Sequence, residues 1–147
     1  MKTRILPTLI VAACAALPLA APAAGTLPPV HKQGGVSYLS GGIGDGQAAA
    51  IKAASPHWPL TLLFAVRTGR SADYLANVQV TVHDAQGRVV LETTADGPYL
   101  LAQLAPGAYQ VDATVAGKTL ARKVKVNAGH PVRAVFVWPE GTDDSGS

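Results

Sequence analysis

The sequence has little of what catalytic and metal-binding proteins usually carry. Its 147 residues include a single cysteine, Cys14, and four histidines that lie far apart. No two histidines have the i, i+2 or i, i+4 spacing that places two imidazoles on one metal ion. No serine lies in the G-x-S-x-G pattern of a nucleophile elbow. We therefore expect no catalytic residues, no cofactor and no metal site.

One enzymatic alternative stays open. Histidines on separate loops could assemble the site of a small-ligand or metal-dependent hydrolase once the chain is folded. The discriminating observation is whether any two of them come within ligand distance of each other. The four residues are His31, His57, His83 and His130.

The excess of basic residues is small. The chain has 12 Lys and Arg against 9 Asp and Glu, a net charge of +3. Removal of residues 1–24 takes away Lys2 and Arg4 and leaves 10 basic against 9 acidic residues, a net charge of +1. Nucleic-acid binding draws most of its affinity from clustered positive charge. Nucleic acid is therefore excluded as an expected partner.

The N-terminal segment has the order of a secretory signal. Lys2 and Arg4 precede an apolar run, Ile5–Ala21, that ends in small residues. Prolines interrupt the run, and a membrane-spanning helix needs about 20 consecutive apolar residues. We expect cleavage near Ala23 or Ala24, a periplasmic mature protein, and no transmembrane span in the mature chain.

A lipid anchor is the alternative to ordinary cleavage. The sequence Val11, Ala12, Ala13, Cys14 resembles a lipobox, in which Cys14 would be lipidated and become the first residue. The apolar run continues past Cys14, whereas a lipoprotein tether is usually polar from its start. After ordinary cleavage the mature chain has no thiol, which excludes disulfides and thiolate metal sites.

A glycine-rich segment, residues 41–46, looks superficially like a phosphate-binding loop. It lacks the Lys and the Ser or Thr that follow the last glycine of that motif, and no βαβ unit surrounds it. We interpret it as a loop in which Asp45 caps a short helix, residues 47–54, that ends before Pro56. The helix is expected to lie against one edge or end of the folded domain.

From residue 60 onward the sequence predicts strand after strand. Val78, Val80 and Val82 alternate with polar residues, which is typical of a half-buried antiparallel strand. The turn formers of residues 84–87 predict a hairpin, and a Pro-Gly turn at residues 106–107 predicts another. Expected strands cover residues 36–39, 60–66, 78–82, 89–93, 99–104, 109–115, 120–126 and 132–138.

Two of these segments have further features. The first, residues 60–66, is apolar on both faces and should be central or covered by the helix, and a polar loop, residues 67–73, follows it. Another, residues 120–126, carries Arg122, Lys123 and Lys125, and Lys118 lies just before it. Such a distribution is typical of an exposed edge protected against sheet association, with an anionic-ligand face as the alternative.

The aromatic residues are interpreted mainly as structural. Tyr109 follows the Pro-Gly turn, where a tyrosine packs inward and ties its hydroxyl to nearby backbone, as in a tyrosine corner. Tyr99 is likewise expected to have a structural role and not to form part of a carbohydrate platform. Trp138 shares the parity of a buried strand face, whereas Trp58 lies between two prolines in an exposed loop.

Residues 75–138 carry a family resemblance. A strand, a D-x-x-G turn, a second strand, then D-G-x-Y and L-x-P-G-x-Y follow one another, and this order is similar to the carboxypeptidase regulatory-like domains. The resemblance implies a transthyretin-like, or prealbumin-like, β-sandwich and no activity. Hydroxyisourate hydrolases share that fold but end in Tyr-Arg-Gly-Ser, whereas this chain ends in residues 142–147, Thr-Asp-Asp-Ser-Gly-Ser, so no catalytic residue carries over.

The expected organisation is a signal peptide (1–24), a flexible lead-in (25–35), a β-sandwich domain (36–138) and a disordered polar tail (139–147). The domain is expected to be all-β, a single antiparallel sandwich of seven or eight strands with one short helix near the N-terminus. The expected function is that of a noncatalytic periplasmic or cell-envelope module that binds an envelope protein or a glycan.

Overall fold

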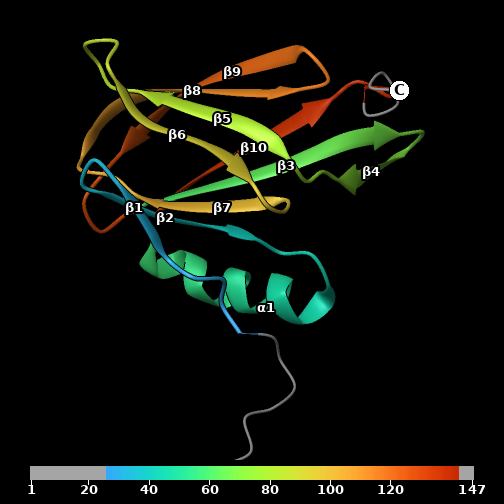
Figure 1. Cartoon of the computed structure of the whole chain (residues 1–147), viewed down its shortest axis with the longest axis horizontal. Helices are drawn as coiled ribbons and strands as arrows, with labels where there is room; N and C mark the ends of the chain where they lie inside the picture. The colour runs from blue at the N-terminus through green and yellow to red at the C-terminus, as the bar shows by residue number, and fades with distance from the viewer. Residues whose placement is uncertain (1–25, 143–147) are drawn as a thin grey trace, which may run out of the picture.

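The computed structural model describes residues 26–142, which form three layers (Figure 1). A four-stranded sheet, in the order β6-β5-β8-β9, packs on a six-stranded sheet, in the order β1-β2-β7-β3-β10 with β4 beside β3. We call them the small sheet and the large sheet. Helix α1 covers the outer face of the large sheet. The elements are β1 His31–Gln33, β2 Val36–Gly41, α1 Asp45–Ala54, the 3-10 helix η1 Ser55–His57, β3 Leu60–Thr68, β4 Ser71–Tyr74, β5 Val78–His83, β6 Val89–Ala95, β7 Tyr99–Gln103, β8 Gly107–Val115, β9 Lys118–Val126 and β10 Val132–Trp138.

The β-sandwich with one helix is as predicted, but it has ten strands in place of seven or eight. The two additional strands are short and polar. Strand β1 lies inside the expected lead-in, residues 25–35, and pairs with β2. Strand β4 replaces most of the expected loop at residues 67–73, because the chain reverses at Gly69, which has a φ of 61°, and pairs back onto β3.

The sheets are not wholly antiparallel. Strands β3 and β10 pair in parallel, from Leu60 with Val132 to Val66 with Trp138. Strand β9 belongs to the small sheet, and the link that follows it crosses to the large sheet at the end where β3 begins. The amide of Val132 donates to the carbonyl of Pro59 at 2.9 Å, which fixes the two strand starts side by side.

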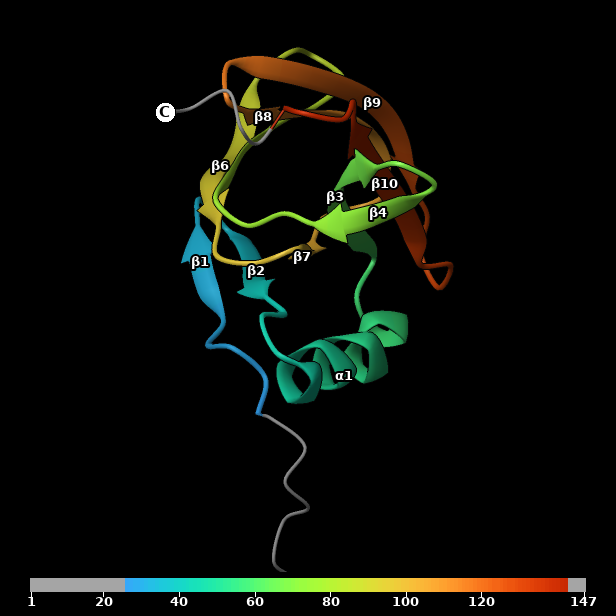
Figure 2. The same ribbon diagram turned by 90° about the vertical axis from the view of Figure 1, so that its right-hand side faces the viewer.

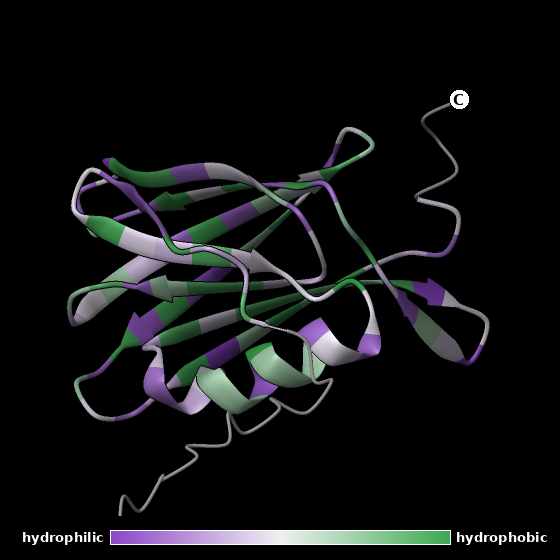
Figure 3. Cartoon of the chain, turned by 60° about the horizontal axis from the view of Figure 1, so that its bottom comes forward, coloured by the Kyte–Doolittle hydropathy of each residue, from purple (hydrophilic) through white to green (hydrophobic). Residues whose placement is uncertain are grey.

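Strand β3 lies at the centre of the molecule. One face places Leu60, Leu62, Phe64 and Val66 in the core between the sheets, where Phe64 contacts the rings of two β10 residues. Colouring by hydropathy shows apolar segments along the facing strands (Figure 3). The other face contributes Leu63 to a second cluster beneath α1. The prediction that this strand is covered on both faces is confirmed.

Helix α1 lies on a face of the large sheet and not at an edge or end, contrary to expectation. Its buried residue Ile51 packs with Leu39, Leu63 and Leu101. The reason is the apolar outer face of β2, β7 and β3, which needs cover. The expected cap is also wrong: Gly44 is the N-cap, no side chain caps the helix, and Asp45 lies in its first turn.

Close packing explains two glycines, Gly97 and Gly42, near Gly41 in space. A side chain on Gly97 would place its Cβ 2.4 Å from the carbonyl carbon and oxygen of Gly41. A side chain on Gly42 would meet the ring of Tyr99, and the Gly42 amide donates to Gln47 Oε1 at 2.7 Å. The segment is therefore shaped by packing against β7 and α1.

The long sides of the sandwich are each closed by a side chain. The amide of Gln33 on β1 bonds Glu92 on β6 twice, accepting from its N–H at 2.7 Å and donating to its carbonyl at 2.9 Å. On the opposite side the Trp138 indole N–H donates to the carbonyl of Lys118 at 3.0 Å. Both contacts join the large sheet to the small one.

The chain beyond β10 is partly ordered. Thr142 is fully buried, and its hydroxyl donates to the carbonyl of Pro139 at 2.6 Å, so residues 139–142 do not form the expected disordered tail. The predicted signal peptide, its alternative anchor at Cys14 and residues 143–147 lie outside the described residues. Within residues 26–142, no helix has the length and apolar character needed to cross a membrane.

Tyr109 ties the β7–β8 link to β8, as predicted. Its hydroxyl donates to the carbonyl of Ala105 at 2.6 Å, and its ring packs against the core with the parity of Val111. The ring is half-buried, not fully buried as expected, because the strand begins at the end of the sandwich. Burial raises the pKa of the hydroxyl above its ordinary value, and the nearby charge of Asp84 adds to the rise.

Loss of this hydroxyl should destabilise the domain modestly. Tyr109→Phe is expected to lower the free energy of unfolding by about 1 kcal/mol, since it removes one good hydrogen bond. Tyr38→Phe is the matched control, because the Tyr38 hydroxyl makes only a long contact, 3.5 Å, with the hydroxyl of Thr93. Urea unfolding measures both. Equal stability of Tyr109→Phe and the native protein would contradict a structural role for the hydroxyl.

The contact between Gly97 and Gly41 should tolerate no side chain. Gly97→Ala is expected to cost about 1 to 3 kcal/mol, because backbone atoms would have to move. Gly87→Ala serves as the control: its φ of 80° costs about 1 kcal/mol, but the added methyl meets open space. Thermal unfolding of the two variants should show Gly97→Ala as the less stable, and the reverse order would refute the close approach.

Candidate binding surfaces

The free edge of β4 is the first candidate surface. Among the described residues, β4 pairs only with β3, and all four of its residues are exposed. The Leu75 amide bonds the Phe64 carbonyl, which sets the phase of the antiparallel ladder. By that alternation the backbone groups of Ala72 and Tyr74 point away from β3. They form a short template for an added strand. Figure 2 shows the β3–β4 hairpin from this end.

An apolar row crosses the large sheet next to this edge. The strand register places Val137, Ala65 and Tyr74 side by side on β10, β3 and β4. They lie on the outer face, past the part of the sheet beneath α1. Tyr74 is 60% exposed and Val137 is 39% exposed. We call these three residues the hairpin row.

Tyr99 supports the hairpin row from beneath. Its ring is buried and lies 6.1 Å from the ring of Tyr74. Burial raises the pKa of Tyr99 above its ordinary value; the neighbouring Tyr74 adds to the rise and Lys52 opposes it. Tyr99 is therefore structural, as predicted, and it holds the exposed ring of Tyr74 beside the sheet.

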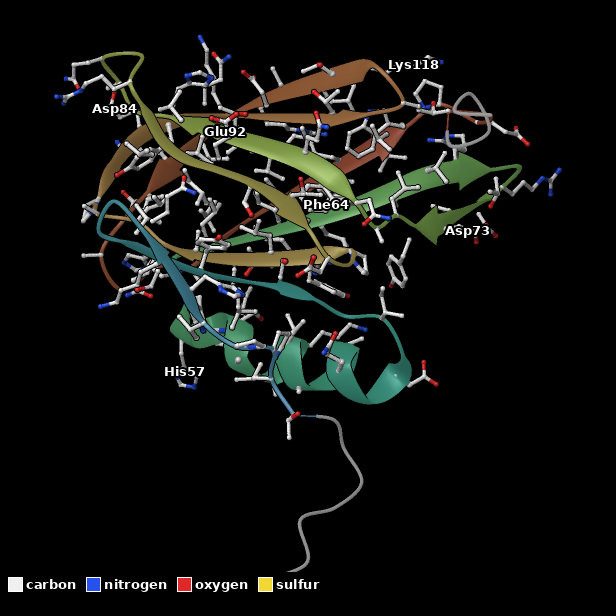
Figure 4. The ribbon with its side chains drawn as sticks, in the orientation of Figure 1. His57, Phe64, Asp73, Asp84, Glu92 and Lys118 are labelled. Carbon is white, nitrogen blue, oxygen red and sulfur yellow. The ribbon has the colours of Figure 1, made fainter. Side chains whose placement is uncertain are left out.

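A groove at the opposite end of β3 is the second candidate surface. Three links form it: residues 56–59, 103–106 and 126–131. Its volume is about 340 Å³, and its walls include His57, Trp58, Gln103, Asn127 and His130. We call it the end groove. His57 lies at this end of the molecule and Asp73 at the other (Figure 4).

A third depression, of about 660 Å³, lies on the small sheet around His83. The His83 Nε2 lies 3.2 Å from Asp112 Oδ2, and Asp112 also accepts from Gln110 at 3.0 Å. Asp84 is occupied by its own turn: it accepts from the amides of Gln86 and Arg88, and the Arg88 amide bond holds the pKa of Asp84 below its ordinary value. The polar groups here already satisfy one another.

Two of the four histidines line the same groove. His57 and His130 line the end groove, and both are exposed. The ring of His31 lies 5.5 Å from that of Tyr38 in a tilted arrangement, and His83 is half-buried in its pairing with Asp112. Within residues 26–142, no group of three His, Cys, Asp or Glu side chains could hold a metal ion.

The basic strand is an edge, as predicted. Strand β9 is the last strand of the small sheet. Lys118, Lys123 and Lys125 are exposed along it, and Arg122 is exposed although it shares the parity of the buried Val124 and Val126. Charged side chains, inward-pointing ones included, are a recognised protection of sheet edges.

Reasoning from the sequence missed Tyr74, the most exposed residue of the hairpin row. Tyr74 ends a run, Ser-Ala-Asp-Tyr, that has no alternation of apolar residues, so it was included in no expected strand. Trp58 is half-buried against the cluster beneath α1 and lines the end groove, where an exposed position was expected. The one available signal was the pair of prolines around it.

Comparison with known proteins adds little. No protein family model matches the chain, and no curated protein matches it. Among solved structures it is similar to GBS52, the minor pilin of Streptococcus agalactiae, with a TM-score of 0.44 and 18% identity over 56% of this chain. The match covers 45% of the pilin chain, less than half of its length. We draw no functional conclusion from this likeness.

The histidine pair in the end groove calls for a direct metal test. We expect purified protein to carry no stoichiometric zinc and to keep its unfolding temperature in chelator, because two histidines fall short of the three or four ligands of a stable zinc site. Elemental analysis and thermal unfolding with and without chelator are the measurements. One bound zinc per chain, lost together with stability in His57→Ala and His130→Ala, would instead favour the hydrolase.

Proposed function

We propose that this chain is a noncatalytic interaction module of the cell envelope that binds an extended segment of a partner protein by strand addition to β4. The observation that carries the proposal is the free backbone edge at Ala72 and Tyr74 beside the hairpin row. Strand addition supplies affinity through main-chain hydrogen bonds and specificity through contacts of alternate side chains.

The other edges are less suited to an added strand. On β6 the outward backbone groups of Glu92 already bond Gln33. Strand β9 is lined with lysines, β10 is joined to β9 through Trp138, and β1 has three residues. Edge protection of this kind is how natural sheets avoid unwanted pairing. Strand β4 carries none of these protections except its shortness.

The shortness of β4 defines the chemistry of the partner. Two outward-facing residues can form only a few hydrogen bonds, each of which contributes about 1 kcal/mol. Binding therefore needs side-chain contacts as well. A partner strand with an apolar residue facing Tyr74 would bury the exposed ring and continue the hairpin row across the new pair.

Three other parts of the proposal rest on the sequence. Export follows from the signal-like N-terminal segment, with a lipid anchor at Cys14 as the alternative. The resemblance to the carboxypeptidase regulatory-like domains rests on the motifs in residues 75–138. The noncatalytic role follows from the absence of nucleophile and metal-spaced motifs in the sequence.

Site-specific photo-crosslinking tests strand addition. A photoreactive amino acid in place of Tyr74 is expected to capture a defined partner in living cells. The same amino acid in place of Val89, an exposed residue on the β6 edge, should capture little. Equal capture from both positions would indicate nonspecific contact and contradict the proposal.

Ala72→Pro distinguishes strand addition from simple side-chain contact. The outward N–H of Ala72 bonds nothing in β3, so proline should preserve the fold while it removes one donor from the edge. We expect the cross-link to fall at least about fivefold with an unchanged unfolding temperature, which matches the loss of about 1 kcal/mol. Ala72→Val keeps the donor and should retain the cross-link. Undiminished capture by the proline variant would exclude backbone pairing at β4.

Mass analysis of the N-terminus tests export. We expect the protein recovered from the periplasm of a Gram-negative host to begin near Ala24, because the apolar run and small residues before it have the form of a cleaved signal. A Cys14→Ser variant should be processed identically. A mature form that starts at a lipid-modified Cys14, and is lost in this variant, would make the protein a membrane-anchored component.

A further inference from the structure

We infer that the end groove is a binding site for a neutral saccharide, separate from the β4 edge. The inference rests on three features of the groove: its shape, its rigidity and its uncharged lining. It goes beyond the proposed function, because the groove lies at the other end of β3, about 25 Å away along the strand.

The shape is suited to a small ligand. The groove volume of about 340 Å³ is near the lower end of the range for small-molecule sites, roughly 300 to 1,000 Å³. It lies where the links before β3 and β10 meet the β7–β8 link. The first two links are held side by side by the bond from the Val132 amide to the Pro59 carbonyl.

The walls are rigid before any ligand arrives. Four prolines line the groove, and each fixes the φ angle of its own link. Trp58 is held by its contacts with the cluster beneath α1 and by its amide, which donates to the Ser55 carbonyl at 3.0 Å. A preformed site loses less conformational entropy when it binds a ligand. The prolines are Pro56, Pro59, Pro106 and Pro131.

The lining matches an uncharged ligand that has both apolar and hydroxyl-bearing surfaces. Among the described residues that line the groove there is no Asp, Glu, Lys or Arg. Gln103 and Asn127 offer amide donors and acceptors, and the imidazoles of His57 and His130 add ring nitrogens that can form hydrogen bonds. Trp58, which also lines the groove, adds apolar surface to these polar groups. The depression at His83, which is lined by Asp84, Asp112 and Lys123, has the opposite character.

Tryptophan fluorescence gives a direct readout of binding. The chain has two tryptophans, and Trp138 is fully buried, so a ligand in the end groove should change the emission of Trp58 alone. The probes are maltose, cellobiose and diacetylchitobiose, with glucuronate as a charged comparison. We expect a saturable change with at least one of the three neutral disaccharides and none with glucuronate.

Matched histidine variants locate the site. His57→Ala and His130→Ala are each expected to weaken disaccharide binding by about fivefold, the effect of one lost hydrogen bond. His31→Ala, which removes an exposed histidine outside the groove, should bind like the native chain. Trp58→Phe keeps an aromatic ring against the cluster, and pelleting on immobilised disaccharide measures its binding. Thermal unfolding confirms that each variant is folded.

Two assays distinguish a soluble sugar from an envelope polymer as the source of the saccharide. Binding of free disaccharides without pelleting on purified peptidoglycan sacculi would indicate a soluble sugar, and binding in both assays would indicate an envelope polymer. Either result supports a saccharide site. The inference is overturned if none of the three disaccharides changes the emission of Trp58 and sacculi fail to retain the protein. The photo-crosslinks at Tyr74 test the β4 edge independently of any of these outcomes.

Discussion

The burial of β3 on both faces is the constraint on which the rest of the structure depends. Its inner face supplies Leu60, Leu62, Phe64 and Val66 to the core between the sheets, and its outer face requires the cover that α1 provides. Its two sides pair with three strands: β7 and β4 on one side and β10 on the other. Strand β7 pairs only with the first four residues of β3, residues 60–63, so the last residues of β3 extend past β7 and pair with β4 instead. The hairpin, the exposed Tyr74 and the free edge all follow from that extension.

The predictability of each element from the sequence reflects whether its signal is local. Strands β5 and β8 have one buried face and one more exposed face, so their sequences alternate clearly between apolar and polar residues. The apolar run of β3 correctly indicates that both of its faces are covered. Strand β4 has no such signal, since all its residues are exposed and only its pairing with β3 makes it a strand. The parallel pairing of β10 depends on where the preceding link crosses between sheets. The presence of His57 and His130 in one groove depends on how separate links are placed in space, and neither arrangement leaves a trace in local periodicity.

The surface of the sandwich divides into closed sides and open ends. Gln33 occupies the edge of β6 and Trp138 joins β10 to β9, so side chains seal both long sides. The two ends differ in chemistry: one presents backbone donors and acceptors with an apolar row, and the other presents amides, imidazoles and an indole without formal charge. In the proposed function, these two ends connect an extended segment of a partner protein to a neutral glycan. Neither contact needs a catalytic group or a metal.

The central claim is that the backbone edge of β4 is where a partner binds, and residue-resolved amide hydrogen exchange tests it most directly. Isotope-labelled protein would be measured in buffer and then in concentrated envelope extract. The account predicts that the amides of Ala72 and Tyr74 exchange rapidly in buffer and become protected in the extract, while those of Ser71 and Asp73, which face β3, change little. Protection that arose along β6, β9 or β10 while Ala72 and Tyr74 stayed unprotected would contradict the account.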